Sequence, residues 1–186
     1  MMTSPRFLRL AVALAALGAV GACTTTRSDS ATPVARAQAE LRATTTAQPV
    51  AGKPVQGLIR FAQMTDGAVR ITGQVNNLAP NARVGFHIHE NGVCSGDGTA
   101  AGGHFNPTGR QHATPGQGHA GDLPMLQADA TGSATVQYVS HDIQLTGPQS
   151  IVNRGLIVHA SPDDYRTQPT GNAGARVACA VIEPGH

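Results

Sequence analysis

Residues 55–63 read VQGLIRFAQ, and residues 68–78 read AVRITGQVNNL. Apolar and polar side chains alternate in both stretches, and this period of two is typical of β-strands that bury one face. Because no convincing helical pattern follows residue 51, the sequence predicts an all-β protein, built as an antiparallel sandwich or barrel. The other expected strands are short segments bounded by Gly, Pro, Asn or Asp, at residues 84–90, 133–139, 155–159 and 176–182.

Two connections between the expected strands, residues 91–122 and 160–175, are too long to be simple turns. Loops of this length inside a compact domain usually carry function. We therefore expect two long functional loops on a β scaffold. Their ligand-type side chains are His104, His112, His119, Asp122, Asp163 and Asp164.

The overall composition limits the possible partners. The chain has 186 residues, a formal net charge of +2, and eight histidines against six aromatic residues. Nucleic-acid binding calls for a basic surface and for aromatic side chains on which bases stack, so we expect no nucleic-acid partner. The slight basicity belongs to the N-terminus, because the chain from Cys23 onward has 11 basic and 11 acidic residues.

The N-terminus has the pattern of an export signal. Arg6 and Arg9 precede residues 10–20, an unbroken run of apolar residues and glycine. A positive start, a short apolar run and a small-residue exit are typical of signal peptides. A membrane-spanning helix needs about 20 apolar residues, so this run is too short to be one.

The exit from the apolar run, VGAC at residues 20–23, resembles the bacterial lipobox. We therefore expect residues 1–22 to be a lipoprotein-type signal peptide and Cys23 to become a lipidated N-terminus. An ordinary cleaved signal with an incidental cysteine is the alternative. The residue directly after Cys23 is Thr24 and not Asp, which resembles the pattern of lipoproteins sent to the outer membrane. The expected location is thus periplasmic, with the lipid as the sole membrane contact.

Residues 23–51 are rich in Thr, Ala, Gln and Ser and show no sustained apolar period. They are expected to form a flexible tether, with residues 35–43 as a short helix at most, which alone would be marginal in water. The folded domain is accordingly expected at residues 52–186.

The histidine spacing indicates metal binding. His87 and His89 lie two apart on an expected strand, so both imidazoles point to one face. Three imidazoles and one carboxylate in the long loop, at His104, His112, His119 and Asp122, make a four-coordinate set that suits zinc. His159 stands at the end of another expected strand and brings the number of candidate histidines to six. An all-imidazole set therefore remains available for copper, for which imidazole is a good ligand.

Four segments together resemble the signature segments of the copper/zinc superoxide dismutase family. They are GFHIHE at residues 85–90, GHFNP at 103–107, HAGDL at 119–123 and GNAGARVAC at 171–179. The resemblance extends from about Val55 to Ile182 and implies a Greek-key β-sandwich. It also implies one copper ion and one zinc ion per subunit. The copper ligands would be His87, His89, His104 and His159, and the zinc ligands His104, His112, His119 and Asp122.

The resemblance further implies how these residues act. The copper centre would cycle between Cu(II) and Cu(I) while converting superoxide into O₂ and hydrogen peroxide. His104 would bridge the two metals and relay a proton, and Arg176 would attract and orient the anion. Thr170 would narrow the channel opposite Arg176, and Asp163 would bond His87 and His112. Cys94 and Cys179 match the family's disulfide.

The expected role is protection of the cell envelope from superoxide, as a monomer or a homodimer. The alternative is a domain without dismutase activity that binds or buffers copper and zinc. All four copper histidines and the arginine are present, which favours the enzyme.

Overall fold

The computed structural model describes Met1 and residues 31–185. The expected signal peptide at residues 1–22 and the expected lipidation site Cys23 lie outside the described residues, apart from Met1. Within the described part of the chain, no helix is long and apolar enough to cross a membrane. The one helical element described there is the 3₁₀ turn η1, Thr99–Ala101.

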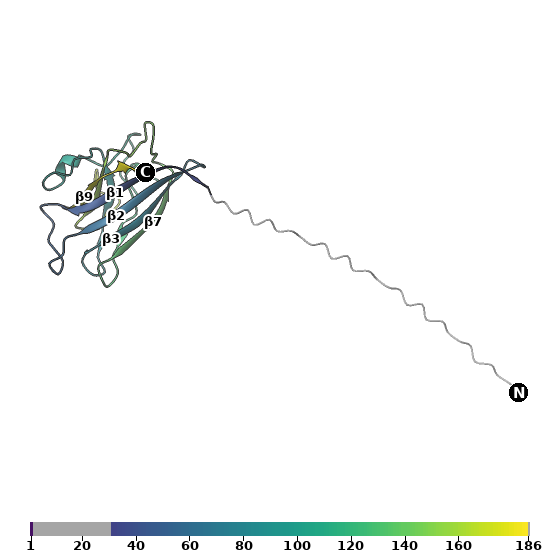
Figure 1. Cartoon of the computed structure of the whole chain (residues 1–186), viewed down its shortest axis with the longest axis horizontal. Coiled ribbons are helices and arrows are strands. Elements are labelled where there is room, and N and C mark those ends of the chain that lie inside the picture. The colour runs from purple at the N-terminus through teal and green to yellow at the C-terminus, as the bar shows by residue number, and fades with distance from the viewer. Residues whose placement is uncertain (2–30, 186) are drawn as a thin grey trace. The chain divides into compact units, whose positions relative to one another are not determined.

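The main sheet is antiparallel throughout and contains eight strands. Figure 1 shows β9, β1, β2, β3 and β7 side by side in this sheet. A small separate sheet pairs β4 (Arg83–Val84) with β6 (Leu126–Gln127), and β10 (Glu183–Pro184) pairs with β1. The order in the main sheet is β5 (Phe86–His89), β8 (Gly155–His159), β9 (Arg176–Val181), β1 (Pro33–Ala43), β2 (Gln56–Met64), β3 (Val69–Asn76) and β7 (Ala134–Ser140).

The alternating residues of β2 and β3 form strands because one face of each strand is buried in the core. Ile59 and Phe61 are buried while Arg60 between them is exposed, and Phe61 lies directly opposite the buried Ile71 of β3. The same hydrophobic core includes Phe86 of β5, from the other end of the sheet order. One core therefore joins the two halves of the sheet.

The long connections follow a Greek-key path. After β3 the chain passes through β4 of the small sheet to β5 in the other half of the main sheet, and it later returns as β7 beside β3. Between β5 and β6 the chain contains only η1, and between β8 and β9 it contains no strand. The predicted antiparallel Greek-key β-sandwich with two long loops is confirmed.

The prediction of a flexible tether over residues 23–51 is wrong for its second half. Pro33–Ala43 is not a helix but strand β1, which pairs with β2 along its length and with β9 at Arg42–Cys179. The compact unit accordingly begins at Ala31 rather than at residue 52. Alternation is present in β1, but the buried positions include Ala37 and Ala39, and alanine is a weak strand signal.

Candidate metal centre

The scaffold of the site is β5, whose four residues are all buried. Phe86 and Ile88 belong to the hydrophobic core, so His87 and His89 point to the opposite face, toward the long loops. His87 forms an isolated bridge with Asp122, and His89 forms one with His104. Backbone pairing therefore holds the first long loop against the two strand histidines.

Two groups of four buried side chains result, and they share His104. Within each group, one ligand-type atom per residue lies within 4.8 Å of those of the other members. The structure thus brings together all seven side chains that the sequence singled out as ligands. The first group is His87, His89, His104 and His159, and the second is His104, His112, His119 and Asp122.

In the first group, outer partners decide which ring nitrogen faces inward. His89 Nδ1 donates to the carbonyl oxygen of Gly102 (3.0 Å), and His159 Nδ1 donates to that of Gly174 (3.2 Å). Carbonyl oxygens only accept, so both rings carry their proton on Nδ1 and an unshared electron pair on Nε2. The two Nε2 atoms face each other at 3.4 Å. Two electron pairs that face each other repel, and a cation bound by both nitrogens would remove this repulsion.

Asp163 ties the two groups together from outside. His87 Nε2 donates to Asp163 Oδ2 (2.6 Å), and His112 Nε2 donates to Asp163 Oδ1 (2.9 Å). The backbone N–H of Tyr165 also donates to Oδ1 (2.7 Å). The structure therefore places Asp163 against the two histidines that the family resemblance assigned to it, and both rings keep Nδ1 for the interior.

Asp122 organises the second group. His104 Nδ1 lies 2.8 Å from Oδ1, His112 Nδ1 lies 3.0 Å from Oδ2, and His119 Nδ1 lies 3.4 Å from Oδ1. The backbone N–H groups of Ala113 (3.3 Å) and His119 (2.8 Å) donate to Oδ2. The carboxylate is therefore fixed in orientation with all three imidazoles beside it.

Burial keeps three rings of the first group, those of His87, His89 and His159, neutral and thus able to bind a metal. Burial lowers the pKa of His87 to about 4 and that of His159 to about 3. It also moves the pKa of His89 well below its ordinary value. Metal binding requires neutral imidazole, so these three side chains need lose no proton at neutral pH.

The carboxylates are ionised despite their burial. Burial opposes ionisation, but hydrogen bonds from His104 and His112 hold the pKa of Asp122 well below its usual range. Asp163 is similar, with its hydrogen bonds from His112 and His87. Burial lowers the pKa of His112, but the two carboxylates together raise it to about 9. His112 is therefore protonated at neutral pH, and a metal bound there would displace this proton.

The buried atoms that lack hydrogen-bond partners test whether a metal fits. In the described part of the chain these side-chain atoms are His87 Nδ1, His104 Nε2 and His119 Nδ1. Buried nitrogens are rarely left unpaired, so each such atom requires an explanation. Three imidazole nitrogens aimed at two neighbouring sites match the ligand chemistry of copper and zinc.

Arg176 lies at the rim of the first group. Its Nη1 and Nη2 donate to the carbonyl oxygens of Gly98 and Gly102, both at 2.6 Å. Gly102 thus accepts from both Arg176 and His89, which links the guanidinium to the first group. Burial lowers the pKa of Arg176, yet a guanidinium remains charged. The half-buried cation is therefore fixed beside the histidines.

A disulfide between Cys94 and Cys179 joins the first long loop to β9, with the two Cα atoms 5.5 Å apart. Cys179 follows Arg176 by three residues, so this bond connects both sides of the rim.

Thr170 is half-buried, and its side chain makes no hydrogen bond to any residue that the structure describes. Its expected role in narrowing a channel stays a prediction.

Sequence reasoning missed two contributors to the site. Gln168 Oε1 accepts from the backbone N–H of His112 (2.8 Å), and Gln168 Nε2 donates to the His112 carbonyl (2.7 Å). Gly171 packs against the Asp163–His112 hydrogen bond so closely that a Cβ there would overlap Asp163 Oδ1. Gln168 carries no local signal, because its partner lies 56 residues away. Gly171 begins one of the signature segments, but its role appears only in three dimensions.

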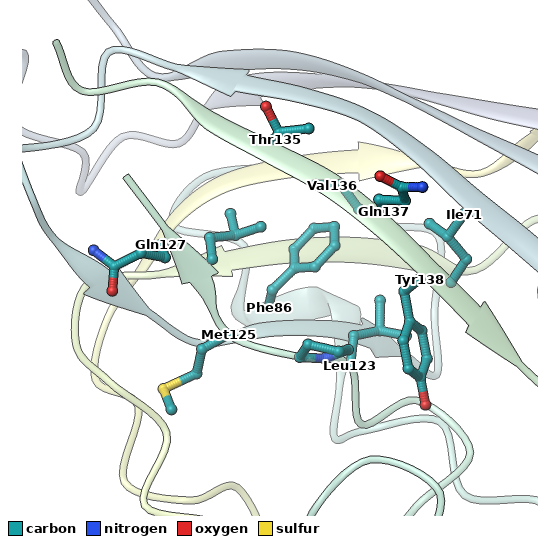
Figure 2. A pocket seen from close by; sticks show the side chains of 11 residues that line it. Ile71, Phe86, Leu123, Met125, Gln127, Thr135, Val136, Gln137 and Tyr138 are labelled. Atoms are coloured by element: carbon teal, nitrogen blue, oxygen red, sulfur yellow. The ribbon is translucent and has the colours of Figure 1, made fainter. Parts of the chain in front are cut away.

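A separate cavity of about 220 Å³ lies between β6 and β7 (Figure 2). Its lining is largely apolar and includes Phe86, Leu123 and Tyr138, but none of the seven ligand-type residues. Phe86 and Leu123 are the chain neighbours of His87 and Asp122. The cavity is therefore next to the metal centre but not part of it.

Comparisons with known proteins agree with this geometry. A family model described as copper/zinc superoxide dismutase matches residues 55–182. Among solved structures, the crystal structure of the clock protein EA4 is similar, with 37% sequence identity and a TM-score of 0.71. That match covers 82% of this chain and 95% of the other.

Proposed function

Since the chain belongs to the copper/zinc superoxide dismutase family, we propose that it converts superoxide into O₂ and hydrogen peroxide. The observation that carries this proposal is the position of His104 in both groups. One of its nitrogens contacts Asp122 in the second group, while the other has no partner among the described residues. A ring placed in this way can bridge two metal ions.

The first group would hold copper and the second would hold zinc. Copper supplies the one-electron cycle that dismutation requires, whereas zinc is redox-inert and serves to organise the site. An all-imidazole set suits copper, and three imidazoles with one carboxylate suit zinc. One ion of each kind would be bound per subunit.

The chain's own residues bind and orient the substrate and move a proton. Arg176 presents a fixed positive charge, which attracts a small anion to the rim and orients it there. His104 Nε2 is buried without an acceptor among the residues described. A proton held at this atom has no competing protein partner, so it is available to the reduced substrate. Asp163 and Asp122 keep the rings in the orientation that this relay needs.

The test is metal analysis and superoxide consumption on the same sample of the full chain. We expect catalytic consumption when copper and zinc are both bound. In Arg176→Ile we expect the rate to fall by about tenfold or more, with unchanged metal content, because one oriented charge is lost. If copper and zinc occupancy is verified and superoxide is not consumed, the metal-buffering alternative replaces this proposal.

We also propose that the protein acts outside the cytoplasm, in the periplasm, anchored to the outer membrane through Cys23. The disulfide supports this location, because such bonds persist in oxidising compartments. The basic start and apolar run before Cys23 support it as well.

Membrane fractionation of a bacterial host tests the anchor. The full chain should be found in the membrane fraction and should incorporate labelled fatty acid. Cys23→Ser should be found without labelled lipid and outside the membrane fraction. Cys94→Ser is the matched control, since it removes a cysteine but leaves the lipid site. Equal labelling of parent and Cys23→Ser would refute lipidation at Cys23.

A further inference from the structure

Two threonines that closely follow β1, Thr44 and Thr46, contact the backbone at the start of β9. Thr44 Oγ1 donates to the Arg176 carbonyl oxygen (2.5 Å), and Thr46 Oγ1 donates to the same oxygen (2.8 Å). The backbone N–H of Thr44 donates to the carbonyl of Val177 (3.1 Å). A carbonyl oxygen has two electron pairs, so the two hydroxyls use the full accepting capacity of Arg176.

Thr44 and its chain neighbour Thr45 also contact the loop that holds the Arg176 side chain. The backbone N–H of Thr45 donates to the Gly96 carbonyl (3.0 Å). A Cβ at Gly98 would lie 3.3 Å from the Thr44 methyl carbon and 3.4 Å from Arg176 Cβ, so Gly98 packs between them. Gly98 is one of the two residues whose carbonyls accept from the guanidinium.

We propose that Thr44 and Thr46 are positioning residues for Arg176. They fix its backbone relative to the loop carbonyls that hold its guanidinium, so the charge stays in one place beside the first group. The consequence of this positioning for catalysis rests on the proposed function, whereas its effect on the Arg176 guanidinium does not.

The long range of these bonds separates this role from ordinary local capping. Threonine hydroxyls often bond to backbone within a few residues in the chain. Here both hydroxyls bond to a residue at least 130 positions away, although they also lie 3.1 Å from each other. The contact thus joins the first strand of the described fold to the strand that carries the arginine.

The test compares two double variants of the full chain. Thr44→Val with Thr46→Val removes both hydroxyls and nearly preserves shape. Thr44→Ser with Thr46→Ser keeps both hydroxyls and removes the methyl groups. The first readout is the ¹⁵N NMR spectrum of labelled arginine in the zinc-loaded protein, which reports restricted rotation of the Arg176 guanidinium without any enzyme assay. Arg176→Ile identifies the signal.

We expect separate, slowly exchanging guanidinium signals in the parent and the serine variant, and averaged signals in the valine variant. Slow rotation retained in the valine variant would overturn the proposal, as would averaged signals in the parent or a serine variant that behaves like the valine variant.

The second readout is a double-mutant cycle on the superoxide rate. The valine pair should lower kcat/KM by about tenfold with unchanged metal content, because small displacements of an orienting group are costly. In the Arg176→Ile background the same pair should change the rate by less than about twofold, since the group it positions is gone. A full additional loss in that background would show that the threonines act on general stability, and would overturn the proposal. A parent without dismutase activity would refute the proposed function alone, because the NMR readout is independent of it.

Discussion

Gly171 shows how closely the backbone of the second long loop approaches the metal centre. Its φ of 63° lies in the left-handed region, which favours glycine. Its α-carbon faces the hydrogen bond between Asp163 and His112, and a Cβ would lie 2.6 Å from His112 Nε2. Both the conformation and the space at this position therefore require glycine.

Gly171→Ala should consequently separate Asp163 from its histidines and weaken metal binding by about 10- to 100-fold, as expected for the loss of an outer partner of metal ligands. Gly109→Ala is a matched control, because Gly109 has a φ of 65° and nothing within 4 Å of its added Cβ. The control should lose only about 1–2 kcal/mol of unfolding free energy, which is the conformational cost of a side chain in the left-handed region. Chelator competition and thermal unfolding measure the two effects, and equal metal affinity in both variants would contradict the role of Gly171.

The residues that bind metal were predictable, whereas the residues that hold them were only partly so. His87, His89 and the loop histidines stand in local patterns whose chemistry is visible in the sequence. Gln168, Thr44 and Thr46 act through contacts with residues 56 or more positions away. Such contacts depend on the register of strands that are distant in the chain, and no local pattern contains that information.

At the scale of elements, most long strands were placed to within a residue or two, but β1 was missed. Its core-facing positions include Ala37 and Ala39, which bury little surface individually and also suit a helix. The pairing partners explain why it is a strand, since it occupies the position between β2 and β9. The two-residue strands β4, β6 and β10 are too short for any period to show.

Truncation tests the importance of β1. A chain lacking residues 1–30 should keep metal binding and cooperative thermal unfolding, because the compact unit starts at Ala31. A chain lacking residues 1–51 should lose both and aggregate, because β2 and β9 would become open edges. Circular dichroism on heating and size-exclusion chromatography provide the comparison. Similar melting of the two truncated chains would show that β1 is dispensable.

At the scale of the whole molecule, the charges nearly cancel. Residues 31–185 contain ten Lys or Arg and ten Asp or Glu, so this part of the chain has no formal net charge. Long-range attraction of an anion therefore receives no support from net charge, and local charge must provide it. Arg176 is the positive side chain fixed at the rim of the first group.

The rate with superoxide should accordingly fall with added salt, but only severalfold. Raising the ionic strength from about 0.01 M to about 0.1 M shortens the screening length from about 30 Å to about 10 Å. In Arg176→Ile the salt dependence should flatten, since the charge being screened has been removed. Stopped-flow measurements over this range test the expectation. A slope as steep in the variant as in the parent would assign the attraction to other charges.

The pairing of β1 with β9 has a consequence for the order of events in the cell. The first strand of the compact unit completes its hydrogen bonds only when the last long strand has arrived, and such distant pairings fold slowly. On the proposed route of export, the N-terminus crosses the membrane first and the segment around Arg176 and Cys179 follows near the end. The seven buried ligand residues then assemble only after translocation is nearly complete. The topology would thus delay metal capture until the chain has reached the compartment in which it works.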